Sequence, residues 1–131
     1  MSSFSAIIAA ILPFLLWPVE MVLPYPAMIE ESAKFLLLYS LARQQSPLDS
    51  RYNFLIVGFF FALTESVLFL YNIHAAGGRD MLILRLILTI PLHVVTSYVS
   101  ISFVRKTRFL GLLCAIAIHA VYNHYIPLLV R

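Results

Sequence analysis

The sequence predicts an all-α membrane protein, a polytopic transmembrane helix bundle that forms one integral-membrane domain over residues 1–131. Two observations lead to this prediction. The chain is 62% hydrophobic and only 11% charged, with a mean hydropathy of +0.94, whereas soluble domains carry about 25% charged residues. Its apolar residues also gather in long runs, most of them close to the ~20 residues that cross a bilayer.

We expect five apolar segments, at about residues 4–23, 27–42, 53–73, 81–104 and 109–130. Pro13 and Pro18 are expected to break the first segment, because proline removes an intrahelical hydrogen bond. The second is the shortest, about 24 Å at ~1.5 Å per residue, and Pro24 and Pro26 just before it suit a helix start. The connection at residues 105–108 is so short that the last two segments are expected to pack as an antiparallel pair.

Polar stretches at residues 43–52 and 74–80 separate the other segments, and the basic residues predict the orientation. If every segment spans, one side holds Arg43, Arg51, Arg105, Lys106 and Arg108. The other side holds Arg79 and Arg131, with Arg85 about a turn inside the fourth segment. Because cytoplasmic loops carry excess Lys and Arg, we expect the amino terminus in the cytoplasm and the carboxyl terminus outside.

Ionisable residues inside four segments fall at one depth. Counted from the nearest arginine on the predicted cytoplasmic side, the distances are 12 residues for Glu31, 14 for Glu65, 12 for His93 and 11 for His119. At ~1.5 Å per residue, all four lie roughly 17–21 Å inward, a little past the middle of a ~30 Å apolar core. The sequence therefore predicts a polar site near the membrane midplane.

Charges at this depth need partners, because each costs ~2.5–3.5 kcal/mol at the centre of a spanning helix. Lys34 follows Glu30 by four residues and Glu31 by three, so its side chain can reach either carboxylate. Glutamate first at i, i+4 is the better helical pair, which assigns Lys34 to Glu30. Glu31, about 100° around the helix, is then left to face the bundle as a base for water.

A purely structural interpretation exists for each of these residues. The two glutamates and the lysine can form a polar clamp between helices, and Ser97 and Asn123, each four residues after a histidine, can be packing groups. Four helices at one level favour a functional site instead. Cys114 is the only cysteine, which excludes a disulfide framework and a paired-cysteine metal site. The basic residues form no stripe, so no nucleic-acid partner is expected.

Four motifs in order resemble the PrsW family: Glu30-Glu-x-x-Lys34, Phe61-x-x-x-Glu65, His93-x-x-x-Ser97 and His119-x-x-x-Asn123. That family belongs with the CAAX prenyl endopeptidases and bacteriocin-immunity proteins, a superfamily of intramembrane proteases. The likeness covers about residues 28–124, although family members are commonly larger. It implies hydrolysis of peptide bonds in transmembrane proteins or peptides, within a lipid bilayer that we expect to be a prokaryotic cytoplasmic membrane.

The resemblance also implies a role for each matched residue. Glu30 and Glu31 match the pair that activates water, Glu65 and His93 match the positions that hold or polarise it, and His119 and Asn123 match the pair that steadies the oxyanion. Lys34 and Ser97 are supporting residues.

A zinc ion, with Glu65, His93 and His119 as ligands together with Glu31, suits this residue set, and such families have been called metalloproteases. No His-Glu-x-x-His helix occurs in the sequence, so glutamate chemistry without a cofactor is favoured.

Two other functions compete with proteolysis. The short chain favours a non-catalytic relative that serves as a scaffold or subunit in an oligomer or larger membrane complex. The same carboxylates and histidines could instead relay protons or ions. The complete set of motifs favours the intramembrane protease.

Overall fold

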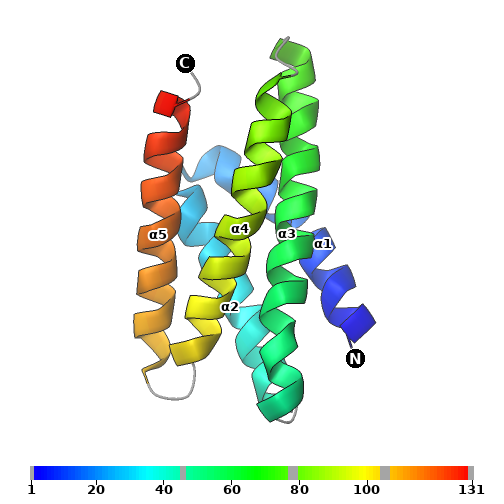
Figure 1. The fold of residues 1–131 in the computed structure, drawn as a ribbon, viewed down its shortest axis with the longest axis vertical. Helices are drawn as coiled ribbons and strands as arrows, with labels where there is room; N and C mark the ends of the chain where they lie inside the picture. Colours follow the sequence, from blue (N-terminus) through cyan, green and yellow to red (C-terminus); the bar gives the residue numbers. More distant parts are fainter. Residues whose placement is uncertain (1, 45–46, 77–79, 104–106, 130–131) are drawn as a thin grey trace.

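The computed structural model describes residues 2–44, 47–76, 80–103 and 107–129, and these residues form helices without a strand. The helices are α1 (Ser2–Val22), α2 (Pro26–Gln44), α3 (Pro47–Ala76), α4 (Asp80–Phe103) and α5 (Arg108–Leu129) (Figure 1). The predicted all-α class is therefore confirmed.

The polar stretch at residues 43–52 is helical over most of its length, which corrects the predicted connection. Helix α2 continues to Gln44, and α3 begins at Pro47. Proline suits the first position of a helix, because its missing N–H would have no intrahelical partner there and its φ angle is already helical. The thirty residues of α3 therefore extend beyond the apolar run at both ends.

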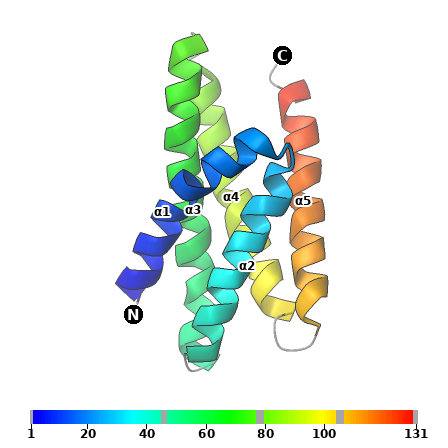
Figure 2. The same cartoon turned by 180° about the vertical axis from the view of Figure 1, so that it is seen from behind.

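Helix α1 bends where the sequence predicted a break. Pro13 and Pro18 both lie inside the continuous helix Ser2–Val22. Figure 2 shows the first part of α1 beside α3 and the second part turning across toward the start of α2. A proline inside a helix removes one hydrogen bond and pushes against the preceding turn, so it bends the helix without ending it.

Three helical stretches in the described residues are long and apolar enough to cross a membrane: Phe4–Val22, Tyr52–Leu70 and Leu86–Phe103. Phe109–Tyr125 is a shorter apolar stretch. Helix α2 carries Glu30, Glu31 and Lys34 and contacts each of the other four helices. The most polar of these helices thus has all four other helices as neighbours, and ionisable groups in membrane proteins are tolerated where they face the interior of a bundle.

Helices α2 to α5 run alternately up and down between the two ends of the bundle (Figure 1). Helices α4 and α5 pack directly on each other, which confirms the predicted antiparallel pair. Arg79, Arg105, Lys106 and Arg131 lie outside the described residues. The orientation of the termini across the membrane therefore stays a prediction.

Two glycines allow α4 to approach its neighbours closely. A Cβ atom on Gly58 of α3 would lie 2.7 Å from the carbonyl oxygen of His93 and 2.7 Å from Cα of Val94. A Cβ atom on Gly111 of α5 would lie 2.8 Å from Cβ of Phe103. Small residues let helix backbones approach in this way in membranes. Gly58 thus seats the backbone of His93 directly against α3.

Candidate active site

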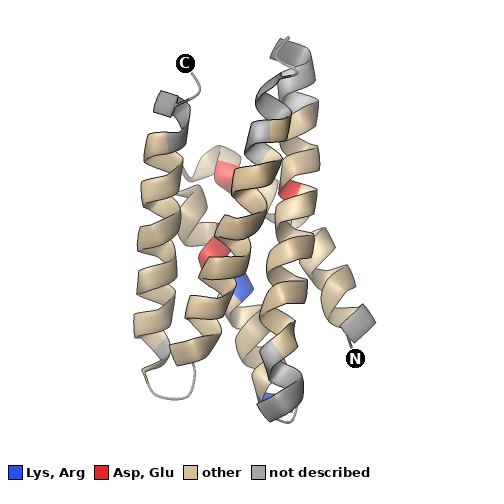
Figure 3. Ribbon diagram, viewed as in Figure 1, with Lys and Arg blue, Asp and Glu red and all other residues tan. Residues whose placement is uncertain are grey.

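The acidic positions coloured in Figure 3 lie within the middle part of the bundle, with a basic position beside them. Six ionisable residues from four helices meet there and are named here the polar cluster: Glu30, Glu31, Lys34, Glu65, His93 and His119. Glu31, Lys34 and His93 are 0% exposed, whereas the Glu65 side chain is 19% exposed. Glu31, Glu65, His93 and His119, which the sequence places at one depth, thus lie in one connected cluster. The catalytic roles expected of them stay a prediction.

Lys34 is surrounded by hydrogen-bonding partners. Its Nζ donates to Glu31 Oε1 over 2.6 Å and to Thr96 Oγ1 over 3.1 Å. The same Nζ lies 2.7 Å from His93 Nδ1. An ammonium group has three N–H donors, so each one has an acceptor within reach. A buried lysine is tolerated when it is paired and hydrogen-bonded in this way.

The predicted pair between Lys34 and Glu30 is wrong, because Lys34 pairs with Glu31. Glu31 Oε1 also lies 2.8 Å from His119 Nδ1, so its carboxylate is shared between α2 and α5. The ammonium is drawn at the same time toward His93 on α4. Spacing on one helix permits either glutamate, and the partners on α4 and α5 decide between them.

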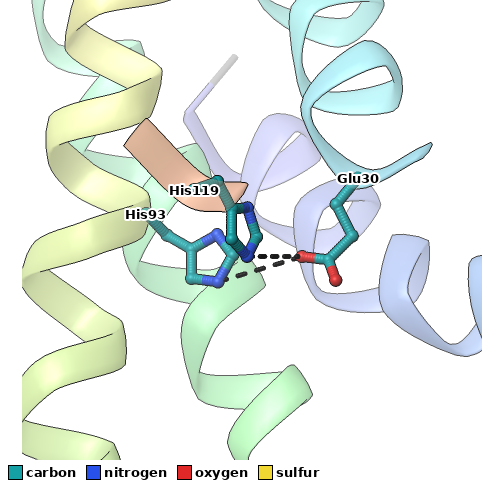
Figure 4. Close-up of side chains that lie close together, drawn as sticks. All are labelled: Glu30, His93 and His119. Carbon is teal, nitrogen blue, oxygen red and sulfur yellow. Dashed lines mark ion pairs between the residues drawn. The ribbon is translucent and has the colours of Figure 1, made fainter. Parts of the chain in front are cut away.

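The Glu30 carboxylate lies near the Nε2 atoms of the two imidazoles. Its Oε2 atom lies 3.9 Å from His93 Nε2 and 4.0 Å from His119 Nε2 (Figure 4). Both separations exceed a hydrogen bond, and within the described part of the chain Glu30 Oε2 is buried without a hydrogen-bond partner. Leaving a buried acceptor unpaired costs about 1–3 kcal/mol, and such an atom in a native structure marks a place for a ligand, ion or water.

Glu65 and Phe61 reach the cluster from α3. Glu65 Oε2 lies 2.5 Å from His93 Nε2. The Phe61 ring packs against the His93 ring, with 5.1 Å between centroids, and 5.0 Å separates its centroid from Lys34 Nζ. Phe61 therefore has the packing role that its position one turn before Glu65 suggests, with an added cation–π contact to the lysine.

Some predicted residues lie outside this network. Asn123 is half-buried and makes no hydrogen bond to the polar cluster among the described residues. Ser97 is buried, and its hydroxyl has no partner there. Thr96 was missed by sequence reasoning, although its place three residues after His93 puts it near the same helix face.

A second missed contact links α4 to α5 beside the cluster. Thr89 Oγ1 and Tyr122 Oη lie 2.9 Å apart. Thr89 precedes His93 by four residues and Tyr122 follows His119 by three, so both lie one turn from a histidine. The Tyr122 and His119 ring centroids are 6.4 Å apart.

Glu30, His93 and His119 are placed so that they could hold a metal ion. Each offers one ligand atom, these atoms lie within 4.8 Å of one another, and all three residues are buried. A carboxylate oxygen with two imidazole nitrogens suits zinc. The zinc set expected from the sequence, Glu65, His93 and His119 with Glu31, shares only the two histidines with this group.

The family profile described as PrsW family intramembrane metalloprotease matches residues 14–130. This range contains all four motifs of the polar cluster and the helices that carry them. Neither a curated protein nor a solved structure matches the chain significantly. The wider superfamily of CAAX endopeptidases and bacteriocin-immunity proteins stays a prediction. With its apolar helices and buried glutamate–histidine cluster, the chain belongs to the PrsW family of intramembrane metalloproteases and is an integral membrane protein.

Proposed function

We propose that this chain is an intramembrane endopeptidase in which Glu30 activates the water that attacks the peptide bond. The observation that supports this most is the buried, unpartnered Oε2 of Glu30, facing two imidazole nitrogens at 3.9 and 4.0 Å. One water molecule can bridge groups at these separations, since each hydrogen bond spans about 2.8 Å. A carboxylate that is not neutralised by Lys34 can accept a proton from that water.

The reaction follows from the groups around this atom. Glu30 takes a proton from water while the water oxygen bonds to the carbonyl carbon of the substrate. His119 in its doubly protonated form donates Nδ1–H to Glu31 and Nε2–H to the developing oxyanion. Asn123, one turn further along α5, adds its amide N–H to the same oxyanion. Glu30 then returns the proton to the leaving amine as the carbon–nitrogen bond breaks.

The proposed substrate is a transmembrane protein or peptide. Peptide bonds inside a spanning helix have their hydrogen bonds satisfied within the helix, so the substrate must unwind locally before its carbonyl reaches Glu30. Within the polar cluster Glu65 is the most exposed residue, with a side chain 19% exposed. We therefore place substrate entry on the side of Glu65.

The test is cleavage of a transmembrane reporter peptide by the purified protein in liposomes. Glu30→Gln is expected to abolish cleavage. Ser102→Ala is the matched control, because Ser102 is exposed on α4 and its hydroxyl donates to the Tyr98 carbonyl oxygen, away from the cluster. Unchanged cleavage by Glu30→Gln would rule out this glutamate as the base.

The same assay tests whether cleavage requires a bound metal ion. Glutamate chemistry predicts cleavage that survives chelation and a protein with far less than one zinc per chain. In the metal alternative Glu30 is a ligand together with His93 and His119, and cleavage is lost on chelation and restored by zinc.

Proton handling is the second candidate, and one observation favours it. Contacts of 2.5 to 2.8 Å connect Glu65, His93, Lys34, Glu31 and His119 in an unbroken chain across three helix interfaces. Such chains can move protons in membrane proteins. Proton flux through liposomes that contain the wild-type protein, without reporter cleavage, would favour this function over proteolysis.

A further inference from the structure

We infer that Lys34 is a positioning residue that fixes the hydrogen of His93 on Nε2, which makes His93 a hydrogen-bond donor and unsuited to bind a metal. The inference concerns the imidazole itself. It depends on the proposed function only where the position of this hydrogen is used to explain cleavage.

The first argument comes from the Nδ1 side of His93. Lys34 Nζ lies 2.7 Å away, and a lysine ammonium can donate hydrogen bonds but cannot accept them. Its charge is supported by Glu31, whose Oε1 accepts from the same Nζ over 2.6 Å. His93 Nδ1 must therefore accept, with its lone pair toward the lysine. A neutral imidazole carries one N–H, so that hydrogen is on Nε2.

The second argument comes from the opposite nitrogen and agrees. His93 Nε2 lies 2.5 Å from Glu65 Oε2, and a carboxylate accepts hydrogen bonds. Glu30 Oε2, another acceptor, is 3.9 Å from the same nitrogen. The ring thus has a donor on one side and acceptors on the other.

Thr96 holds the lysine in this position. Its hydroxyl accepts from Lys34 Nζ over 3.1 Å and donates to the His93 carbonyl oxygen over 3.3 Å. Thr96 is 0% exposed, so water does not compete for these bonds. The lysine is therefore tied both to the ring and to the backbone of the residue that it orients.

His119 has the opposite arrangement. Its Nδ1 faces the Glu31 carboxylate at 2.8 Å, so Nδ1 carries a hydrogen and Nε2 is the nitrogen that can bind or release a proton. Histidines that bind metals donate their other N–H to a carboxylate or carbonyl in this manner. His119 fits that pattern, whereas His93 faces an ammonium. Of the three residues that are close enough to hold a metal, Glu30 and the neutral form of His119 thus offer free electron pairs, and His93 does not.

The direct test is the hydrogen position on His93, measured by nitrogen-15 NMR on histidine-labelled full-length protein in micelles. His93→Gln assigns the signal by its loss. We expect a protonated Nε2 and a bare, hydrogen-bonded Nδ1 in the wild type without substrate or metal. A bare Nε2 in the wild type would overturn the inference, and this measurement requires no Lys34 variant to fold.

Variants and cobalt titration separate positioning from a merely structural role. Lys34→Arg, which keeps a charged donor, is expected to retain the wild-type signal, and Lys34→Met is expected to lose the preference for Nε2–H. Thr89→Val, on the same helix but bonded to Tyr122, is the control that leaves it unchanged. Added cobalt is expected to give no tetrahedral spectrum that depends on His93. Such a spectrum at one equivalent, lost in His93→Gln, would overturn the inference.

These readouts do not involve proteolysis, so the two proposals can fail separately. Absence of reporter cleavage with the expected nitrogen-15 signal would refute the proposed function alone. Cleavage that depends on Glu30, with a bare Nε2 on His93, would refute the role of Lys34 alone.

Discussion

Two neighbouring glutamates on α2 divide the polar cluster into two unlike halves. The closed half contains Glu31, Lys34 and Thr96, and its contacts measure 2.6 to 3.1 Å. The open half contains Glu30, whose Oε2 faces His93 and His119 at 3.9 and 4.0 Å and is buried without a partner in the described part of the chain. Glu31 Oε2 is likewise buried without a hydrogen-bond partner among the described residues, so the two glutamates differ in the partners of their other contacts. Glu31 is paired with Lys34 and His119 through Oε1, whereas within the residues that the structure describes Glu30 has no ion pair with the lysine.

The difference shows how one helix can carry both a structural and a reactive carboxylate. A buried ion pair such as Glu31–Lys34 resists disruption, because removing one partner leaves an uncompensated charge. A carboxylate without an ammonium partner in the same dry surroundings contributes less to stability, and its unpaired oxygen has capacity left for a water or substrate group. The closed half is thus expected to control folding, and the open half to control reaction.

The largest expected effect is on the open half. Glu30→Gln removes the proposed base while keeping size and one carbonyl oxygen, so we expect reporter cleavage to fall by about 10²–10⁴-fold, the usual contribution of a general base. The melting temperature in detergent is expected to stay close to that of the wild type, because Glu30 Oε2 has no hydrogen bond to lose. A large drop in melting temperature would place Glu30 in the closed half instead.

The second effect is on the closed half. Glu31→Gln leaves Lys34 buried without its counter-charge and weakens the contact to His119, so we expect a loss of about 3–5 kcal/mol in unfolding free energy. The measurement is denaturant-induced unfolding in micelles, beside Glu30→Gln as the matched variant. If the two glutamines destabilise equally, the division into halves is wrong.

The depth of the cluster could be predicted from the sequence, because helices rise by a fixed ~1.5 Å per residue. Counting from the arginines at the ends brought Glu31, Glu65, His93 and His119 to one level, and the structure joins all four. The five helices followed from the apolar runs in the same way. The predicted ends of the helices were less accurate, because the hydrophobic pattern does not show that the polar residues after Pro47 are also helical.

The partner of Lys34 could not be predicted from the sequence. Spacing on α2 allows Glu30 and Glu31 alike, and the small preference of about 0.2–0.5 kcal/mol for one helical pair is outweighed by contacts with other helices. Those contacts, with His93 and Thr96, depend on how α2 is rotated against α4. Rotation about a helix axis depends on packing details that a single sequence does not reveal.

A third prediction compares the two close helix contacts, one near the cluster and one away from it. Gly58→Ala puts a methyl group 2.7 Å from the His93 carbonyl oxygen, and Gly111→Ala puts one 2.8 Å from Phe103 Cβ. We expect each to cost about 1–3 kcal/mol of stability through overpacking. If Gly58→Ala folds, it is expected to lose cleavage as well, because the added methyl group pushes α4, and His93 with it, away from α3. Gly111→Ala, if it folds, is expected to keep cleavage. Equal cleavage by both would show that the open half tolerates displacement of α4.

The smallest expected effect concerns the bond between Thr89 and Tyr122, which lies in neither half. It joins α4 to α5 one turn from each histidine, and Tyr122 Oη is 2.9 Å from Thr89 Oγ1. Tyr122→Phe removes this bond without changing the ring near His119, so a loss of about 0.5–1.5 kcal/mol is expected. Thr89→Val and the double variant complete a mutant cycle in unfolding free energy, in which a shared bond appears as non-additivity. Cleavage is expected to change little, because neither hydroxyl faces Glu30 in the proposed reaction. If Tyr122→Phe instead lowers cleavage as far as Glu30→Gln with stability unchanged, the tyrosine hydroxyl acts on the substrate, and the open half extends along α5.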